Sequence, residues 1–322
     1  MGAVAEASGK KKMSGMLFGY IILIGLCILA WAIFKILAPD SFGSVSDLVK
    51  YFEAGLMEAT GAVGFYFVMV MGMFDFSIGA TIMTSAITGC ILATRVGLGY
   101  PGLIIGCIVC GCIIGAINGI LYVKLRIPSM IVTVGLALIY EAVATYIAGA
   151  SEPRLTSELK GLGSMPWDLI VAVIAFVLAW LLLNYTKIGT YTYAIGSNEF
   201  VAKNMGINVN KYKVLAFIIS GTFFGIMAVL TISYGGSMRA ETNMESMSRN
   251  FPPTMGCFLG LAFRKYGIPI QAIIIGEFLF QIVYFGFVAL GAPTAMKDVI
   301  LGVALLIVVA LTTKVAKDEI VK

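Results

Sequence analysis

Apolar runs of about 20 residues recur along this chain, and they constrain its fold more than any other feature, because a helix of that length crosses a bilayer. Only 12% of the residues are charged, whereas soluble domains carry about 25%. A helix also satisfies its backbone hydrogen bonds within its own segment, as lipid requires. The sequence therefore predicts an all-α polytopic membrane protein.

The distribution of charge predicts how the chain crosses the membrane. We expect about ten transmembrane helices with both termini cytoplasmic, since most of the 22 Lys and Arg residues then lie inside. Residues 1–15 would form a cytoplasmic tail, residues 16–313 the membrane domain and residues 314–322 a second cytoplasmic tail. A cleaved signal peptide is the alternative at the start, but the run from Met16 to Leu37 is longer than a signal core.

Several functional classes are disfavoured by composition. The net charge of +5 comes from residues at span ends, so it does not indicate nucleic-acid binding. The six cysteines lie in apolar runs, and without histidine the CxxCxC at 107–112 is better explained as small buried residues than as a metal site. The chain contains no P-loop motif for ATP. A transporter that depends on an external energy source fits these observations best.

The longest polar interval inside the apolar sequence runs from Tyr185 to Lys213. We expect a short helix here, capped by Ser197, with an ion pair between Glu199 and Lys203 and an end at Gly206. Such a helix is too short to be stable alone in water, so it predicts a protein partner. Four lysines place this interval on the cytoplasmic side: Lys187, Lys203, Lys211 and Lys213.

A break interrupts the apolar sequence between residues 54 and 94. Asp75 lies between Gly72 and Gly79 in this break, which is the pattern of a broken helix beside a transport pathway. The alternative is that Asp75 caps the following helix at the membrane edge. The sequence leaves both interpretations open.

Two GxxxG pairs predict close packing between helices. The first consists of Gly115 and Gly119, and the second of Gly256 and Gly260. Each pair is followed by a basic turn and a proline at the same offsets, which indicates a repeated structural device.

Further polar residues lie inside the predicted spans. Asn118 lines a pathway or makes an interhelical hydrogen bond. Glu141 is a functional candidate because an intramembrane carboxylate must face protein or water. Glu277 and Gln281 are one helical turn apart and are expected to face the same side.

The remaining segments complete the predicted topology. Polar residues at 150–165 and 235–249 are expected to form external loops. Two last spans are predicted at Pro269–Leu290 and Met296–Thr312.

Two rival functions come from other classes. One is an ion-coupled secondary transporter in which Glu58, Glu141 or Glu277 carries protons. The other is an intramembrane enzyme, although no pair of carboxylates stands out as catalytic. Neither explains the short, charge-balanced helix in the interval from Tyr185 to Lys213.

Four motifs, in order, resemble those of permease subunits of bacterial ABC importers for simple sugars. This is the ribose-type branch, related to permeases for branched-chain amino acids and nucleosides, and the resemblance covers residues 55–313. The motifs are GMFDFSIG at 72–79, GAING at 115–119, RIPSMIVTVG at 126–135 and YAIGSNEFVAKNMGI at 193–207.

The resemblance implies a transport component rather than an enzyme, in the bacterial inner membrane. It implies a second permease subunit, a cytoplasmic ATPase that holds ATP and magnesium and grips the segment 185–213, and an external solute-binding protein. The ATPase-coupling residues are then Gly196, Ser197, Asn198, Glu199, Ala202, Lys203 and Gly206. The substrate-pathway candidates are Asp75, Ser77, Asn118, Thr133, Glu141, Glu277 and Gln281.

The expected substrate is a monosaccharide such as ribose, with a nucleoside or another small polar solute as the alternative. Two stretches depart from the family pattern. Glu141-Ala142 stands where the family has Arg-Gly, and residues 255–267 lack its glycine-rich run. These departures raise the alternative that the chain is the divergent half of a heterodimeric permease.

Overall fold

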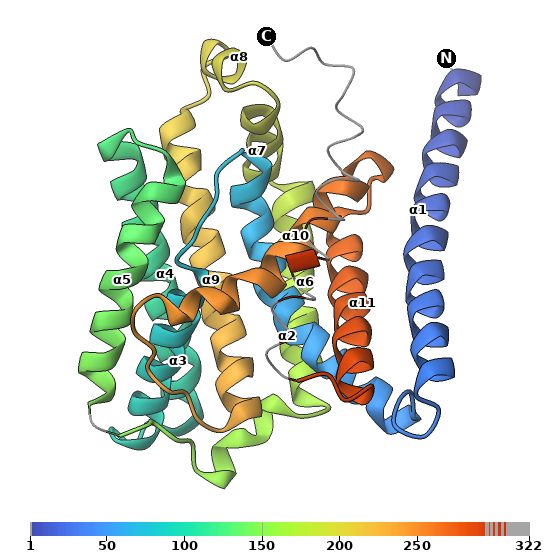
Figure 1. Ribbon diagram of the computed structural model, residues 1–322. Helices are drawn as coiled ribbons and strands as arrows, with labels where there is room; N and C mark the ends of the chain where they lie inside the picture. The colour runs from blue at the N-terminus through green and yellow to red at the C-terminus, as the bar shows by residue number, and fades with distance from the viewer. Residues whose placement is uncertain are drawn as a thin grey trace. The chain divides into compact units, whose positions relative to one another are not determined.

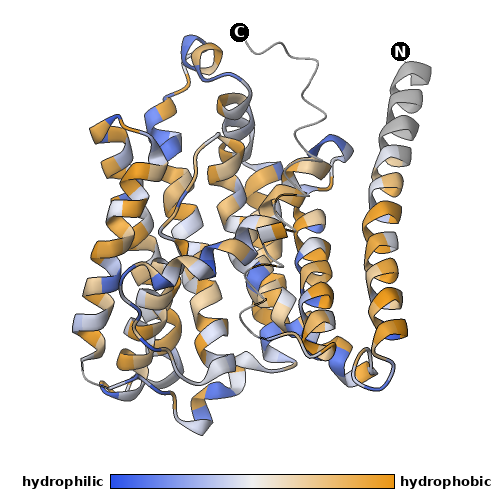
Figure 2. Cartoon of the chain, viewed as in Figure 1, coloured by the Kyte–Doolittle hydropathy of each residue, from blue (hydrophilic) through white to orange (hydrophobic). Residues whose placement is uncertain are grey.

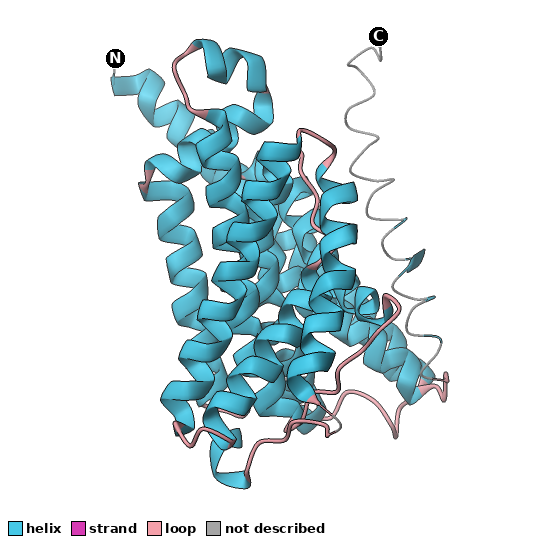
Figure 3. Cartoon of the chain, turned by 90° about the vertical axis from the view of Figure 1, so that its left-hand side faces the viewer, coloured by secondary structure: helices cyan, strands magenta, loops and turns pink. Residues whose placement is uncertain are grey.

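The computed structural model describes residues 2–149 and 151–293, together with positions 296, 299, 302, 303 and 306. Within these residues every secondary-structure element is a helix (Figure 3), so the predicted all-α class is confirmed for that part of the chain. The predicted last span, Met296–Thr312, and the tail at 314–322 lie outside the continuously described ranges.

The elements comprise α-helices and three short 3₁₀ helices, η1 to η3. In chain order they are α1 (Gly2–Leu37), α2 (Val45–Val70), α3 (Ile78–Thr94), α4 (Gly99–Leu125), α5 (Ser129–Ala148), η1 (Ser157–Gly163), α6 (Trp167–Tyr185), α7 (Lys187–Ser197), α8 (Glu199–Asn204), α9 (Val209–Gly235), η2 (Glu245–Asn250), α10 (Phe251–Ala262), η3 (Phe263–Tyr266) and α11 (Pro269–Ala289).

Six of the described helices are long and apolar enough to cross a membrane, and their apolar residues dominate Figure 2. These six spans are Gly15–Leu37, Gly99–Leu125, Ser129–Ala148, Trp167–Tyr185, Val209–Gly235 and Pro269–Ala289. Helices α3, with 17 residues, and α10, with 12 residues, are shorter than the roughly 20 residues that a full crossing needs.

The chain divides into two compact units, residues 1–59 with 254–322 and residues 60–253. In the second unit, α4 packs against α9 through glycine. A Cβ on Gly115 would lie 3.2 Å from the Cα of Gly221, and one on Gly119 would lie 2.9 Å from the Cα of Val214. The predicted close approach at the first GxxxG pair is confirmed.

In the first unit, α1 packs along α11. Leu23 of α1 is fully buried in a cluster with Leu259 of α10 and Ala272 of α11. The second GxxxG pair faces α11, because a Cβ on Gly260 would lie 2.7 Å from a side-chain atom of Ile273. The predicted packing role of this pair is confirmed as well.

A short linker joins α2 to α3 within the second unit, and it positions the candidate site. Figure 1 shows the chain leaving α2 and turning into a non-helical stretch before α3 begins. Gly72 opens this linker with φ +75°, a left-handed conformation that glycine adopts without steric cost. The chain is therefore non-helical between Val70 and Ile78, as both interpretations of the segment 72–79 require.

Candidate functional site at the helix break and the short helix α8

The linker between α2 and α3 leaves backbone N–H groups without helical partners, and hydroxyl groups of α5 accept from two of them. The N–H of Phe74 donates to Ser129 Oγ at 3.0 Å, and that of Phe76 donates to Thr133 Oγ1 at 2.9 Å. Backbone polar groups removed from water need such partners. Thr133, a predicted pathway residue, thus supports the break.

Asp75 lies at the centre of a buried hydrogen-bond network. Its Oδ1 accepts from the backbone N–H and hydroxyl of Ser77 at 2.8 and 2.7 Å, and its Oδ2 accepts from Asn118 Nδ2 at 3.1 Å. Only 3% of Asp75 is exposed. The carboxyl group of Asp75 therefore orders the turn that leads into α3, whose N-cap residue is Ser77.

Asn118 joins this network to α5. Its Nδ2 also donates to Ser77 Oγ at 2.7 Å, and its Oδ1 accepts from the hydroxyl of Tyr140 at 2.8 Å. We call Asp75, Ser77, Asn118 and Tyr140 the Asp75 cluster. The structure thus brings three predicted candidates together, and it adds Tyr140, which sequence reasoning missed because an aromatic residue in an apolar span carries no polar signal.

A second missed residue, Asn250, supports the start of α3 from the opposite side. Its Oδ1 accepts from the N–H of Gly79 at 2.6 Å, and its Nδ2 donates to the carbonyl of Phe76 at 2.7 Å. Gly79 has no room for a side chain, because a Cβ there would overlap the carbonyl of Ser246. The position of Asn250 directly before Phe-Pro-Pro was the available signal, since asparagine often precedes a helix.

Glu141 is buried, with 2% exposed, and it holds the segment before α10. Its Oε2 accepts from the N–H of Met244 at 2.8 Å, and its Oε1 accepts from the N–H of Ser246 at 3.1 Å. Glu141 lies well inside α5, so the end of the segment predicted as an external loop at 235–249 packs into the unit. The carboxylate substitutes for the partners that water would give these amides.

Glu277 and Gln281 belong to the other compact unit, which comprises residues 1–59 and 254–322. Glu277 is fully buried, and its Oε1 accepts from the N–H of Gly256 at 3.0 Å. Gln281, one turn further along α11, is only partly buried. Helices α10 and α11 therefore meet at Glu277, and Gln281 is more exposed than Glu277 on the same helix.

The predicted short helix exists, but its cap and its ion pair differ from the prediction. Asn198 caps α8, since its Oδ1 accepts from the N–H of Val201 at 3.0 Å. Ser197 instead ends α7, and its hydroxyl donates to the carbonyl of Tyr193 at 2.8 Å. Glu199 pairs with Lys213 at 2.8 Å rather than with Lys203, because α9 brings a buried lysine closer than the next helical turn does.

Other features of this segment agree with the prediction. Gly206 has φ +84° and ends the helix, with its N–H donating to the carbonyl of Lys203 at 3.0 Å. Gly196 lies so close to α2 that a Cβ there would overlap the carbonyl of Val70. Ala202 is 2% exposed and faces the protein, whereas Phe200 and Met205 are 72% and 76% exposed.

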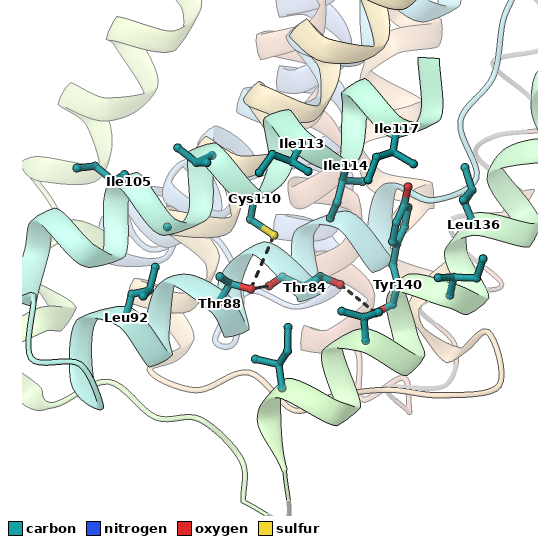
Figure 4. Close-up of a pocket in the computed structure, with 15 residues that line it drawn as sticks. Thr84, Thr88, Leu92, Ile105, Cys110, Ile113, Ile114, Ile117, Leu136 and Tyr140 are labelled. Carbon is teal, nitrogen blue, oxygen red and sulfur yellow. Dashed lines mark hydrogen bonds between the residues drawn. The ribbon is translucent and has the colours of Figure 1, made fainter. Parts of the chain in front are cut away.

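An apolar pocket of about 570 Å³ lies between α3, α4 and α5 (Figure 4). Its hydroxyl groups already have partners: Thr84 Oγ1 donates to the carbonyl of Ala80 at 2.7 Å, and Thr88 Oγ1 donates to that of Thr84 at 2.8 Å. The remaining lining is mostly apolar, so few polar groups of this pocket are directed into it.

The described residues hold no cluster of three or more His, Cys, Asp or Glu side chains that would bind a metal ion. All six cysteines are free thiols, and Cys107, the first of the CxxCxC, is fully buried. Cys110 and Cys112, the other two cysteines of this motif, are partly buried.

Comparison with known proteins gives a consistent assignment. The profile of the family described as the branched-chain amino acid transport system permease component matches residues 55–309. The chain is 32% identical over 222 residues to the ribose import permease of Haemophilus influenzae, covering 65% of this chain and 67% of the relative. It is 28% identical over 223 residues to the ribose import permease of Escherichia coli K12, covering 66% and 68%.

A third relative matches almost end to end. The D-allose transport system permease protein of Escherichia coli K12 is 24% identical over 326 residues, which cover 97% of this chain and 98% of the relative. The family and its members are transport permeases of the membrane rather than enzymes. The chain belongs to the family of branched-chain amino acid transport system permease components, and it is a multi-pass membrane protein of that family.

Proposed function

We propose that this chain is the membrane-spanning subunit of an ATP-driven importer for a monosaccharide of the ribose and allose type. The names of the relatives supply the substrate class. The family match over residues 55–309 supplies the permease role. In this proposal about ten spans cross the inner membrane with both termini cytoplasmic, and a second permease subunit, identical or divergent, completes the pathway.

The exposed apolar surface of α8 carries the proposal of an ATPase partner. Phe200 and Met205 are 72% and 76% exposed, although they lie in a polar, lysine-rich interval. Six residues cannot form a stable helix without packing, since isolated helices need about 12 to 15 residues. Apolar side chains presented on such a helix fit the groove of a partner protein. We infer that the partner is the cytoplasmic ATPase, which holds ATP and magnesium.

The mechanism follows from these parts. An external solute-binding protein delivers the sugar, the ATPase subunits close on binding ATP, and their motion is transferred to α8. The spans then change between outward and inward openings. The Asp75 cluster acts in this account as the framework of the helix break, because all of its members already form hydrogen bonds with protein partners.

The test is purification of the tagged chain in mild detergent from its native membrane, with identification of the proteins that accompany it. The double variant Phe200→Asp with Met205→Asp changes only exposed side chains at α8. A substitution at Ala202 would disturb folding instead, because this residue is buried. Val45→Asp is the matched control, since Val45 is 81% exposed on another helix. We expect an ATPase with the native chain and with the control, and its loss from the folded α8 variant.

A folded native chain that is recovered without any ATPase would contradict the proposal and favour an ion-coupled transporter. A second, related permease in the same sample would identify a heterodimer, and its absence with an ATPase present would identify a homodimer. Uptake of labelled ribose, D-allose and a nucleoside by cells that express the complete system then identifies the substrate.

A further inference from the structure

One ion pair holds α8 against the helices of the second unit. Lys213 Nζ on α9 donates to both carboxylate oxygens of Glu199, each at 2.8 Å. The side chain of Lys213 is only 11% exposed, whereas that of Glu199 is 54% exposed. A lysine so far removed from water needs a partner that carries the opposite charge. Glu199, the first residue of α8, provides that partner.

The same ammonium group also reaches α4. Lys213 Nζ donates to the hydroxyl of Tyr122 at 3.3 Å and lies 5.4 Å from the centre of its ring. The ring of Tyr122 packs in turn on Phe217 of α9, with the ring centres 5.8 Å apart. Three helices, α4, α8 and α9, therefore meet at one charged atom.

From Tyr122, helix α4 leads directly to the Asp75 cluster. Asn118 precedes Tyr122 by one helical turn, so the two side chains lie on the same side of α4. Asn118 donates to Asp75 at 3.1 Å and to Ser77 at 2.7 Å. A displacement of α8 that Lys213 transfers to Tyr122 would thus act on the start of α3.

Helices α4 and α9, which connect Lys213 to the Asp75 cluster, are closely packed against each other. A Cβ added to Gly115 of α4 would collide with the backbone of α9 at Phe217 and Gly221, and one added to Gly119 would collide with it at Val214. Closely packed interiors transmit displacement because they are nearly incompressible. Helices α4 and α9 are therefore suited to move as one body when α8 moves.

We propose that the contact of Glu199 and Lys213 with Tyr122 is the link through which α8 moves the Asp75 cluster. Lys213 is the positioning residue of this link. The inference rests on the proposed function, because it requires an ATPase that acts on α8. The alternative is an ion pair that only keeps α8 folded, and the two differ in what they predict for coupling.

The experiment measures sugar molecules transported per ATP hydrolysed, together with recovery of the ATPase, in the purified complex reconstituted in liposomes. Lys213→Met removes the charge and retains an unbranched apolar side chain. We expect this variant to keep its ATPase and to hydrolyse ATP, while the transport ratio falls about tenfold, within the range for mutations of coupling residues.

Lys211→Met is the matched control, because Lys211 lies on the same helix and is exposed, and its ratio should equal that of the native protein. The charge-swapped pair Glu199→Lys with Lys213→Glu should recover most of the native ratio. The hydroxyl of Tyr122 accommodates either charge, since it accepts from an ammonium and donates to a carboxylate.

Three results would overturn the inference. The first is a folded Lys213→Met complex with the native transport ratio. The second is loss of the ATPase from that variant, which would make the pair part of the docking surface. The third is a charge-swapped complex that assembles but does not recover the native transport ratio. If Lys213→Met fails to fold, the transport ratio of the charge-swapped complex alone tests the inference. Failure of the proposed function is distinct from all three, because no ATPase would then accompany the native chain.

Discussion

Replacing Asn118 with leucine tests whether the Asp75 cluster holds the helix break together. Asn118 is 1% exposed, and leucine has a similar size and shape, so the change removes hydrogen bonds and little packing. The native side chain makes three: to Asp75 at 3.1 Å, to Ser77 at 2.7 Å and from Tyr140 at 2.8 Å.

The magnitude follows from the chemistry of these bonds. Side-chain hydrogen bonds between membrane helices contribute about 0.6 kcal/mol on average, and a buried acceptor left without its partner costs about 1–3 kcal/mol. The loss of two such bonds, together with Asp75 Oδ2 left without its donor, gives a loss of about 3 kcal/mol in the free energy of unfolding. Tyr140→Phe removes one neutral bond and should cost about 0.6 kcal/mol.

Equilibrium unfolding in mixed detergent micelles, followed by tryptophan fluorescence, measures both values. A double-mutant cycle between positions 118 and 140 should give a coupling energy of about 0.5 kcal/mol or more. Asn184→Leu is the control, because Asn184 is exposed, and it should change stability by less than about 0.5 kcal/mol. A loss below about 1 kcal/mol for Asn118→Leu, or strict additivity with Tyr140→Phe, would refute this account of the cluster.

Three further predictions concern other contacts. Glu141→Gln replaces one acceptor oxygen with an amino group, so a buried backbone N–H loses its partner, and detergent unfolding should show a loss of about 1–3 kcal/mol. Gly115→Ala forces α4 away from α9 and should lower the yield of folded protein, whereas Gly135→Ala, with no atom within 4 Å of a Cβ, should be neutral or slightly stabilising. The hydroxyl of Ser237 helps hold the pKa of Glu152 below its usual range. The hydrogen bond that joins their loops is therefore fully present above the ordinary carboxyl pKa, and it is lost as the pH falls through the lowered value. Hydrogen exchange near Ser237 measures this loss, and the Glu152→Gln variant should show no such pH dependence.

Features that depend on local pattern could be predicted from the sequence. The GxxxG pair at Gly115 and Gly119 identified a helix contact, because absent side chains allow close approach whichever helix is the partner. Asp75 between Gly72 and Gly79 identified the break, because a charged residue flanked by glycines disfavours a continuous apolar helix. Gly206 was identified because a left-handed residue ends a helix.

Features that depend on distant partners could not be predicted. The i,i+4 rule paired Glu199 with Lys203, but Lys213 is buried and its need for a counter-charge is stronger than that of an exposed lysine. Tyr140 and Asn250 escaped notice because their partners are 22 and 171 to 174 residues away in the chain. Chain order gives no sign of such contacts.

Polarity alone also gave an incomplete description of one segment. Residues 235–249 have the composition of an external loop, yet Met244 and Ser246 lie against Glu141 in α5. A polar segment can pack into a membrane protein where a carboxylate satisfies its backbone N–H groups. The sequence marked Glu141 as a functional candidate, but it gave no sign of this contact with residues 103 and 105 positions further along the chain.

In the proposed mechanism, ATP hydrolysis that is transferred through α8 drives sugar import by this chain. The most direct measurement is uptake of labelled ribose or D-allose into cells that express the chain with its ATPase and solute-binding protein, with and without a protonophore that leaves cellular ATP intact. We expect uptake to continue under the protonophore and to stop when the ATPase carries an inactivating substitution. Uptake that collapses under the protonophore and survives loss of the ATPase would contradict it.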